Sequence, residues 1–443
     1  MKEANYYFIN SPFIECKGII NASTKYNGKI SFDNDFNIHF LNAKHQSDLE
    51  LSKLSFFYDN YPLEIKVDNS KCQILNDTIN VLNSQINILD SDLSFDGEIH
   101  NLFNNILVDS TKIVHIIGNL ISTTFNLKSL ISNNDKENKV VEEYNMPGRF
   151  NLDLKTSINS LAYNNIYPNQ VNCHLIYKDN AVSTKDLRMN LLSGQMLFDG
   201  KFYKNTENNF KLTGNIKLEN IDVKKTFSAF NNFGQDFIMA KHIKGKSSSS
   251  IICNITLNKF LEIDLDKINI DSKVSIEKGE LIDFKPLESL SNYVKLDDLA
   301  HIKFSKLENE IKIKDKIISV PNMEIKSSAL SLIISGKHFF NQEYNYKISL
   351  LLSDLLAKRF RKKDKEFNNQ DSTSLLKTNL QLRMVGDKEN SEISFEKLKI
   401  KENLKNEIKK EILDVKKIIS EEINKKESDE EDEELEIEWD DNF

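Results

Sequence analysis

Four cysteines and eight histidines are the side chains in this sequence best suited to hold a metal or to carry redox and acid–base chemistry. Their spacing gives them no common site, because the sequence has no CxxC pair and no HExxH motif. The GxSxG turn of serine hydrolases and the glycine-rich phosphate loops are also missing. We therefore predict no catalytic residue, no metal site and no cofactor. We interpret the four cysteines, Cys16, Cys72, Cys173 and Cys253, as buried, inert thiols.

The charge of the chain is concentrated at its C-terminal end. The 443 residues have a formal net charge of −8, yet residues 427–443 hold 11 acidic side chains and no basic ones. Without them, 59 basic residues stand against 56 acidic ones, a net charge of +3. Such a balance lacks the basic excess that phosphate backbones require, so we predict no nucleic-acid partner.

The N-terminal residues 1–20 contain one early lysine and an apolar stretch interrupted by asparagine, proline and glutamate. This is not the pattern of a signal peptide. No run in the sequence reaches the roughly 18 apolar residues of a membrane-spanning helix. We therefore expect either a soluble protein or a piece of a longer chain.

Alternation of apolar and polar residues dominates the chain, as in residues 150–154 and 211–218. This period of two predicts strands with one wet face. Clusters of Asn, Asp, Lys and Gly between them, such as residues 26–29 and 177–180, are typical of hairpin turns. The predicted fold class is mainly β: an elongated, repetitive antiparallel β-sheet, groove-like or taco-like, with a few short helices and a C-terminal amphipathic helix.

Two short helices are predicted before residue 400, at residues 222–233 and 284–300, because their apolar residues are spaced three to four apart. In the first, these residues are Phe227, Phe230 and Phe233. We interpret both helices as crossovers or plugs between segments of the sheet.

An internal repeat appears when the chain is shifted by 136 residues. Lys178, Asp179, Ser183, Gly200 and Lys201 then fall on Lys314, Asp315, Ser319, Gly336 and Lys337. A weaker third copy, at an offset of 103 residues, places Phe95, Asp96 and Gly97 under Phe198, Asp199 and Gly200. One unit of several strands is therefore reused, and units that cannot bury their own apolar faces must share a continuous one.

The domain organisation follows from these patterns. Residues 1–131 are predicted to form an N-terminal β-repeat region and residues 150–400 a second β region, with a flexible insert at residues 132–149. Residues 401–426 have the apolar stripe of an amphipathic helix. Residues 427–443 form a like-charge run, which predicts a disordered acidic tail.

Every second residue of the repeated strands is apolar, which gives the sheet one apolar face. Two interpretations of this face stay open. Two such faces can pack on each other as a sandwich core. Alternatively, an open sheet can line a groove with them, which the scarcity of helices able to cover the sheet favours. Under the second interpretation acyl chains contact Leu93, Phe95, Met196, Phe198, Phe202, Leu212, Ile216, Leu330, Leu332, Ile334, Ile348 and Leu350.

A succession of strands, glycine turns and a short helical segment is indicated by Ser275–Leu281, Phe284–Leu287, Ile302–Phe304, Ile311–Ile318 and Ile325–Leu330. Together these segments resemble the C-terminal region of the AsmA family, which is related to TamB-like bridge-like lipid transfer proteins. The resemblance covers residues from about 150 to 400 and is similar to versions of the family in Bacteroidetes-type bacteria. Its motifs are loose strand patterns, so no site residue is carried over.

The resemblance implies a β-groove protein that faces the periplasm, is associated with the inner membrane and supports outer-membrane assembly or phospholipid transfer. The anchor helix typical of the family is missing, so we expect a truncated or fragmentary chain. The predicted function is non-enzymatic: to hold or conduct phospholipid or other acyl lipid, with a possible envelope protein partner at residues 401–443. The alternative is a scaffolding β protein that recruits a partner through that helix and acidic tail.

Overall fold

The structure is a computed structural model in two compact units, Met1–Ser394 and Phe395–Phe443. It describes residues 13–32, 38–58, 61–102, 105, 111–127, 129, 143–144, 146, 148–284, 300–327, 331–351, 379–387 and 390–395. The predicted insert, the C-terminal helix and the acidic tail lie wholly or mostly outside these residues. All elements below belong to the first unit, at whose boundary the last strand ends.

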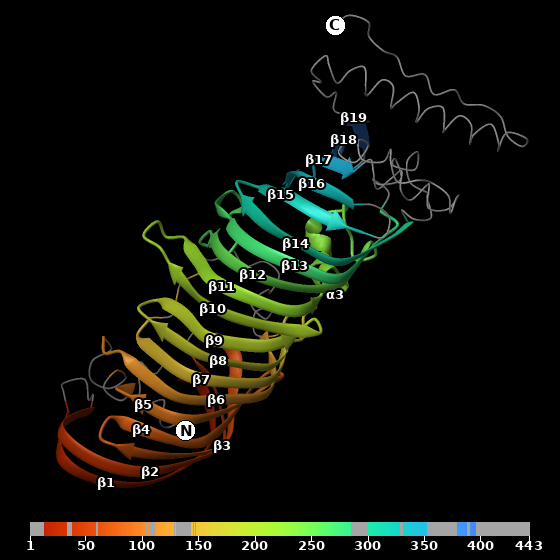
Figure 1. Ribbon diagram of the computed structural model, residues 1–443. Coiled ribbons are helices and arrows are strands. Elements are labelled where there is room, and N and C mark those ends of the chain that lie inside the picture. Colours follow the sequence, from red (N-terminus) through yellow and green to blue (C-terminus); the bar gives the residue numbers. More distant parts are fainter. Residues whose placement is uncertain are drawn as a thin grey trace, which may run out of the picture. The chain divides into compact units, whose positions relative to one another are not determined.

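The first unit consists mainly of long, curved β-strands that follow one another in chain order (Figure 1). The first ten are β1 Phe13–Phe32, β2 Ile38–Tyr58, β3 Tyr61–Leu75, β4 Thr78–Ile88, β5 Ser91–His100, β6 Val114–Asn126, β7 Phe150–Ala162, β8 Asn169–Lys178, β9 Ala181–Leu191 and β10 Gly194–Lys204. The rest are β11 Phe210–Asp222, β12 Ile243–Leu257, β13 Asn269–Ile282, β14 His301–Lys314, β15 Ile317–Lys326, β16 Ser331–Phe339, β17 Tyr344–Leu351, β18 Asn379–Gly386 and β19 Ser391–Phe395.

Strands β1 to β18 each pair with the next, so they form one large open sheet and not two sheets packed face to face. The predicted fold class, mainly β with a repetitive antiparallel sheet and few helices, is confirmed. One pair differs: β6 and β7 run parallel. Parallel neighbours require a connection that returns the chain to the same end of the sheet, and residues 127–149 are that connection.

The lysine–aspartate pairs of the internal repeat lie at hairpin turns. Asp179 and Asn180 between β8 and β9 have φ of 52° and 54°, and Asp315 and Lys316 between β14 and β15 have φ of 54° and 59°. Two successive left-handed residues give the tight turn whose twist matches that of the flanking strands. The repeat unit is therefore a four-stranded meander, β8–β11 and again β14–β17.

Glycines of the repeat make room for an aromatic ring on the sheet. Gly200 of β10 pairs with Gly214 of β11, and a Cβ at these positions would lie 2.2 Å and 2.5 Å from ring atoms of Phe198. The ring of Phe198 therefore lies over both glycines, which covers backbone that would otherwise be bare. In the third copy, Gly97 of β5 pairs with Gly118 of β6, and Phe95 lies against Gly118.

Helical structure in the described residues is short. The helix predicted at residues 222–233 is present as α3 (Val223–Ala229), capped by the Asp222 side chain, followed by a 3₁₀ turn, η2 (Asn231–Gly234). A second 3₁₀ turn, η3, covers Leu265–Lys267. The helix predicted at residues 284–300 lies outside the described residues except for its two ends.

Candidate functional site

One face of the sheet carries the apolar residues of every repeat, and we call it the inner face. It is defined by the residues that pair across neighbouring strands: Phe95 with Leu120, Met196 with Leu218, Phe198 with Ile216, Phe202 with Leu212, Ile216 with Ile251, and Ile334 with Ile348. Side chains of paired residues point to the same side of a sheet. The pairing therefore extends one apolar surface from strand to strand.

The structure places ten of the twelve predicted lipid-contact residues on the inner face. Leu93 and Phe95, for example, lie on β5 with the same parity. Leu330 lies outside the described residues, and the side chain of Leu350 is not described. Strand parity alone was sufficient to find these positions.

Burial along the inner face is uneven. At the end formed by β13–β18, Ile348 is 0% exposed and Leu382 is 1% exposed. On β10 and β11 the side chains of Met196, Phe198, Phe202, Leu212 and Ile216 are only half-buried. We call the inner face of β9–β12 the middle region. It lies between the buried residues of β13–β18 and a second buried cluster, around Val81, Phe95 and Leu154, on the strands before it.

The buried end has a core of its own, which we call the closed end. It consists of Phe284, Ile302, Leu332, Tyr344, Ile348, Leu382 and Met384. Strands β14, β16, β17 and β18 all contribute to this cluster, together with Phe284 just after β13. The ring of Phe237 contacts both Phe284 and Tyr344 and so joins the two sides of the cluster.

Residues 223–242, the connection between β11 and β12, lie across the inner face and are called the crossing segment. Helix α3 packs on β11 and β12, and Val223 is buried there. Farther along, Phe237 and Ile238 pack against the closed end, where the Phe237 ring centroid is 4.5 Å from that of Tyr344 and 5.1 Å from that of Phe284. The crossing segment therefore packs on both β11–β12 and the closed end. In the middle region Phe210 of β11 is 0% exposed, and Tyr144 meets its ring edge-on at 5.5 Å.

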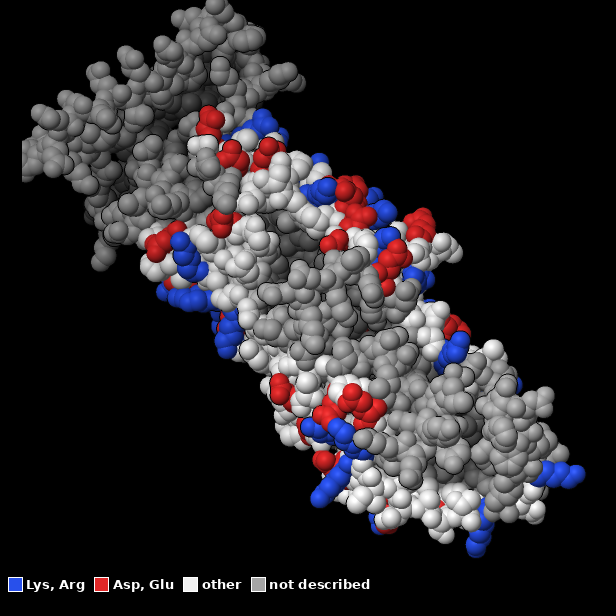
Figure 2. Space-filling view, turned by 180° about the vertical axis from the view of Figure 1, so that it is seen from behind, with Lys and Arg blue, Asp and Glu red and all other residues white. Residues whose placement is uncertain are grey.

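The outer face of the sheet is polar and carries charges of both signs. Lys273 pairs with Glu310 and Lys312 with Asp271 between β13 and β14. The view from behind in Figure 2 likewise shows Lys and Arg interspersed with Asp and Glu at the edges of the described surface. Adjacent residues on β12 show the difference between the faces: Ile252, on the outer face, is 63% exposed, whereas Ile251 pairs with Ile216 and is half-buried. The charged and exposed side chains of the outer face are typical of a surface in contact with water.

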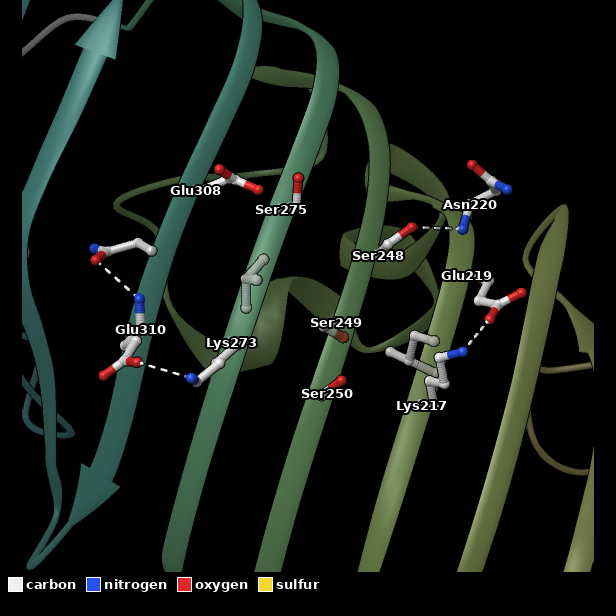
Figure 3. Close-up of a pocket in the computed structure, with 13 residues that line it drawn as sticks. Lys217, Glu219, Asn220, Ser248, Ser249, Ser250, Lys273, Ser275, Glu308 and Glu310 are labelled. Atoms are coloured by element: carbon white, nitrogen blue, oxygen red, sulfur yellow. Dashed lines mark hydrogen bonds and ion pairs between the residues drawn. The ribbon is translucent and has the colours of Figure 1, made fainter.

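A hollow of about 640 Å³ lies on the outer face over β11–β14 (Figure 3). Small serines on β12 and β13 form its floor, while Lys217 pairs with Glu219 at 2.7 Å and Lys273 with Glu310 at 3.4 Å at its sides. Helix α3 lies behind the strands in this view, on the opposite face of the sheet. Both lysines at the sides of the hollow are therefore paired with a carboxylate.

An aromatic cluster at the closed end was not predicted from the sequence. His338 is 7% exposed, stacks on Tyr344 and contacts the rings of Phe237 and Tyr346. Its Nε2 atom has no hydrogen-bond partner among the described residues. Burial lowers the pKa of His338 and raises the pKa of Tyr346 to about 12. The only sequence signal was the apolar parity of β16 and β17, which does not tell a buried histidine from an exposed one.

The four cysteines are free thiols in the structure. Cys72 and Cys253 are buried, Cys16 and Cys173 are half-buried, and burial raises the pKa of all four thiols. A raised pKa favours the unreactive thiol form. Within the described ranges, no three His, Cys, Asp or Glu side chains are grouped to hold a metal ion.

Comparison with known proteins gives no relative: no family model, no curated protein and no solved structure matches this chain. The resemblance to the AsmA family therefore stays a prediction from the sequence. Among the described residues, no helix is long and apolar enough to cross a membrane.

Proposed function

We propose that the protein is a non-enzymatic lipid-holding protein whose inner face contacts the acyl chains of phospholipid or of another acyl lipid. The observation that carries this proposal is the half-buried apolar surface of the middle region, which is continuous with the inner face on both sides. Burial of about 0.8 kcal/mol per methylene supplies affinity without specific polar contacts. Lipid headgroups would remain in water.

The proposed setting is the bacterial cell envelope, with the protein facing the periplasm and contributing to outer-membrane assembly or lipid homeostasis. This part of the proposal is supported by the resemblance to the AsmA family alone. The scaffolding alternative depends on residues 401–443, which lie outside the described residues, and it stays a prediction.

Two neighbouring isoleucines on β12 provide a matched test of lipid binding. The purified chain, stripped of lipid, is titrated with a fluorescent phosphatidylcholine, and the Ile251→Asp and Ile252→Asp variants are compared with it. We expect Ile251→Asp, on the inner face, to weaken uptake by roughly tenfold or more, because a charge replaces apolar contact. Ile252→Asp, on the outer face, is expected to bind as the parent does.

Thermal unfolding of both variants separates a binding defect from a folding defect. If the parent chain takes up no phospholipid, or if both variants lose uptake equally while remaining folded, the proposal is wrong. Mass spectrometry of lipid that co-purifies with the parent chain provides an independent check.

A further inference from the structure

The crossing segment exposes a cluster of three phenylalanines. Phe230 is 46% exposed and Phe233 is 57% exposed. The ring of Phe233 stacks on Phe230 with centroids 5.5 Å apart and meets Phe227 edge-on at 5.2 Å. Exposed aromatic residues in mutual contact form an apolar patch, and such a patch marks a binding surface more often than single exposed residues do.

Several backbone groups of the crossing segment form hydrogen bonds within the segment. The Gln235 side chain donates to the carbonyls of Asn232 and Ile238 and accepts from the Ile238 N–H. Asn232 Oδ1 accepts from the Ala240 N–H at 2.8 Å, and His242 Nδ1 accepts from the Met239 N–H at 3.2 Å. Backbone groups with internal partners can face hydrocarbon without the cost of a lost hydrogen bond.

The conformation around Phe233 is unusual for an exposed side chain. Asn231, Asn232 and Phe233 have φ of 48°, 53° and 56°, three left-handed residues in succession. This conformation is unfavourable for a phenylalanine, and it persists only where neighbouring contacts hold it. The bond from Ala240 N–H to Asn232 Oδ1 is such a contact, and its result is a phenylalanine ring held out of the core.

The position of the cluster links the two parts of the inner face. Helix α3, which carries Phe227, packs on β11 and β12 of the middle region, whereas Phe237 packs into the closed end. A ligand lying along the middle region towards the closed end would therefore meet the crossing segment. The three phenylalanines carry no charge, which suits the methyl end of an acyl chain and not a polar headgroup.

We propose that Phe227, Phe230 and Phe233 form the binding site for the methyl-terminal part of an acyl chain, and that the crossing segment ends the acyl path there. This inference rests on the proposed function, because it assigns the place where an acyl chain on the inner face stops. It names an acyl chain as the occupant, since the three side chains are uncharged hydrocarbon rings and backbone groups beside them, such as the Ala240 N–H, already bond within the segment.

Photo-crosslinking tests the site with two phosphatidylcholine probes. One probe carries a diazirine near the methyl end of an acyl chain, and the other carries it next to the ester. After irradiation of the intact chain, mass spectrometry locates the labelled residues. We expect the methyl-end probe to label residues 227–233 several-fold more than the ester-end probe does, and both probes to label β10 and β11.

Variants of the exposed phenylalanine sharpen the result. Phe233→Asp is expected to lower methyl-end labelling of the segment several-fold, and Phe233→Leu to retain most of it. Tyr167→Asp is the matched control, because Tyr167 is a 69% exposed aromatic residue in the turn between β7 and β8. The control is expected to leave the labelling unchanged.

Three results would overturn the inference while leaving the proposed function in place. They are labelling of β10 and β11 without labelling of residues 227–233, equal labelling of β17 beyond the crossing segment, and a change of oligomeric state in Phe233→Asp with unchanged labelling. Absence of labelling anywhere on the inner face would instead overturn the proposed function.

Discussion

The closed end and the middle region are built from the same four-stranded unit, yet they differ in burial. Ile348 on β17 is fully buried, whereas Ile216 on β11 is half-buried. The two are comparable because their strand partners, Ile334 and Phe198, coincide in the repeat. Both pair with an apolar residue of the preceding strand, Ile348 with Ile334 and Ile216 with Phe198. The strand pattern is therefore the same in both places, and what distinguishes the closed end is the packing of Phe237 and Ile238 against it.

The largest expected difference between the two regions is in the free energy of unfolding that is lost when Ile348 or Ile216 is truncated to alanine. Ile348→Ala is expected to lower the free energy of unfolding by about 2–5 kcal/mol, because it leaves a cavity in a packed core. Ile216→Ala is expected to cost about 1 kcal/mol, since a half-buried side chain has less contact to lose. Urea unfolding of the two variants measures both. Equal losses would mean that the two regions are packed alike.

Substitution of a glycine under Phe198 tests whether the packing of that ring on the sheet stabilises the middle region. Gly214→Ala places a methyl group 2.5 Å from the Phe198 ring and 2.7 Å from the Asp199 carbonyl oxygen, so the ring must move off the sheet. We expect a loss of about 1–3 kcal/mol in the free energy of unfolding, as for other overpacked sites. Gly148→Ala is the control, because nothing lies within 4 Å of its added methyl group. A neutral Gly214→Ala would show that Phe198 is free to repack.

The buried histidine allows a change that stabilises the closed end. The Nε2 atom of His338 has no hydrogen-bond partner in the part of the chain that the structure describes, and an unsatisfied buried polar group costs about 1–3 kcal/mol. His338→Phe keeps a flat ring among Phe237, Tyr344 and Tyr346 and removes that atom. We expect the free energy of unfolding to rise by about 1–2 kcal/mol at neutral pH, measured by urea unfolding. A loss of stability would imply that the Nε2 atom makes a favourable contact.

The strands and their faces could be predicted from the sequence because both depend on local patterns. Hairpin turns at Asp179 and Asp315 and the alternation on β10 and β11 are set by residues within a few positions of each other. Bulges at Asp186 and Asn220, left-handed residues with φ of 52° and 55°, shift the register without moving the apolar residues off the inner face. For this reason the predicted contact residues lie together.

The closed end could not be predicted, because its contacts join residues far apart in the chain. Phe237 meets Tyr344 across more than a hundred residues, and the spacing of Phe227, Phe230 and Phe233 predicted a short helix but not where it would pack. The parallel pair β6 and β7 depends in the same way on the path of a long connection. Which segment packs on which part of the sheet depends on contacts between distant residues. The alternation of apolar and polar residues along a strand carries no information about such contacts.

The smallest expected difference between the closed end and the middle region is in their stability at low pH. Burial lowers the pKa of both His338 and His242, so the folded state favours the neutral imidazoles. Protonation must then oppose folding: the stability that these groups contribute is complete above the unfolded pKa of about 6.5 and falls as the pH decreases below it. Since His242 borders Phe284 and His338 borders Tyr344, the loss should be confined to the closed end.

Hydrogen exchange followed by mass spectrometry at pH 7.5 and at pH 5, corrected for the intrinsic pH dependence of exchange, measures this difference. Strands β16–β17 should lose protection at the lower pH, whereas β10 and β11 of the middle region should keep theirs. In His338→Phe the loss should be smaller, because only His242 remains to titrate. Equal loss of protection on β10 and β17 would show that acid weakens the whole sheet and would remove the histidines as its cause.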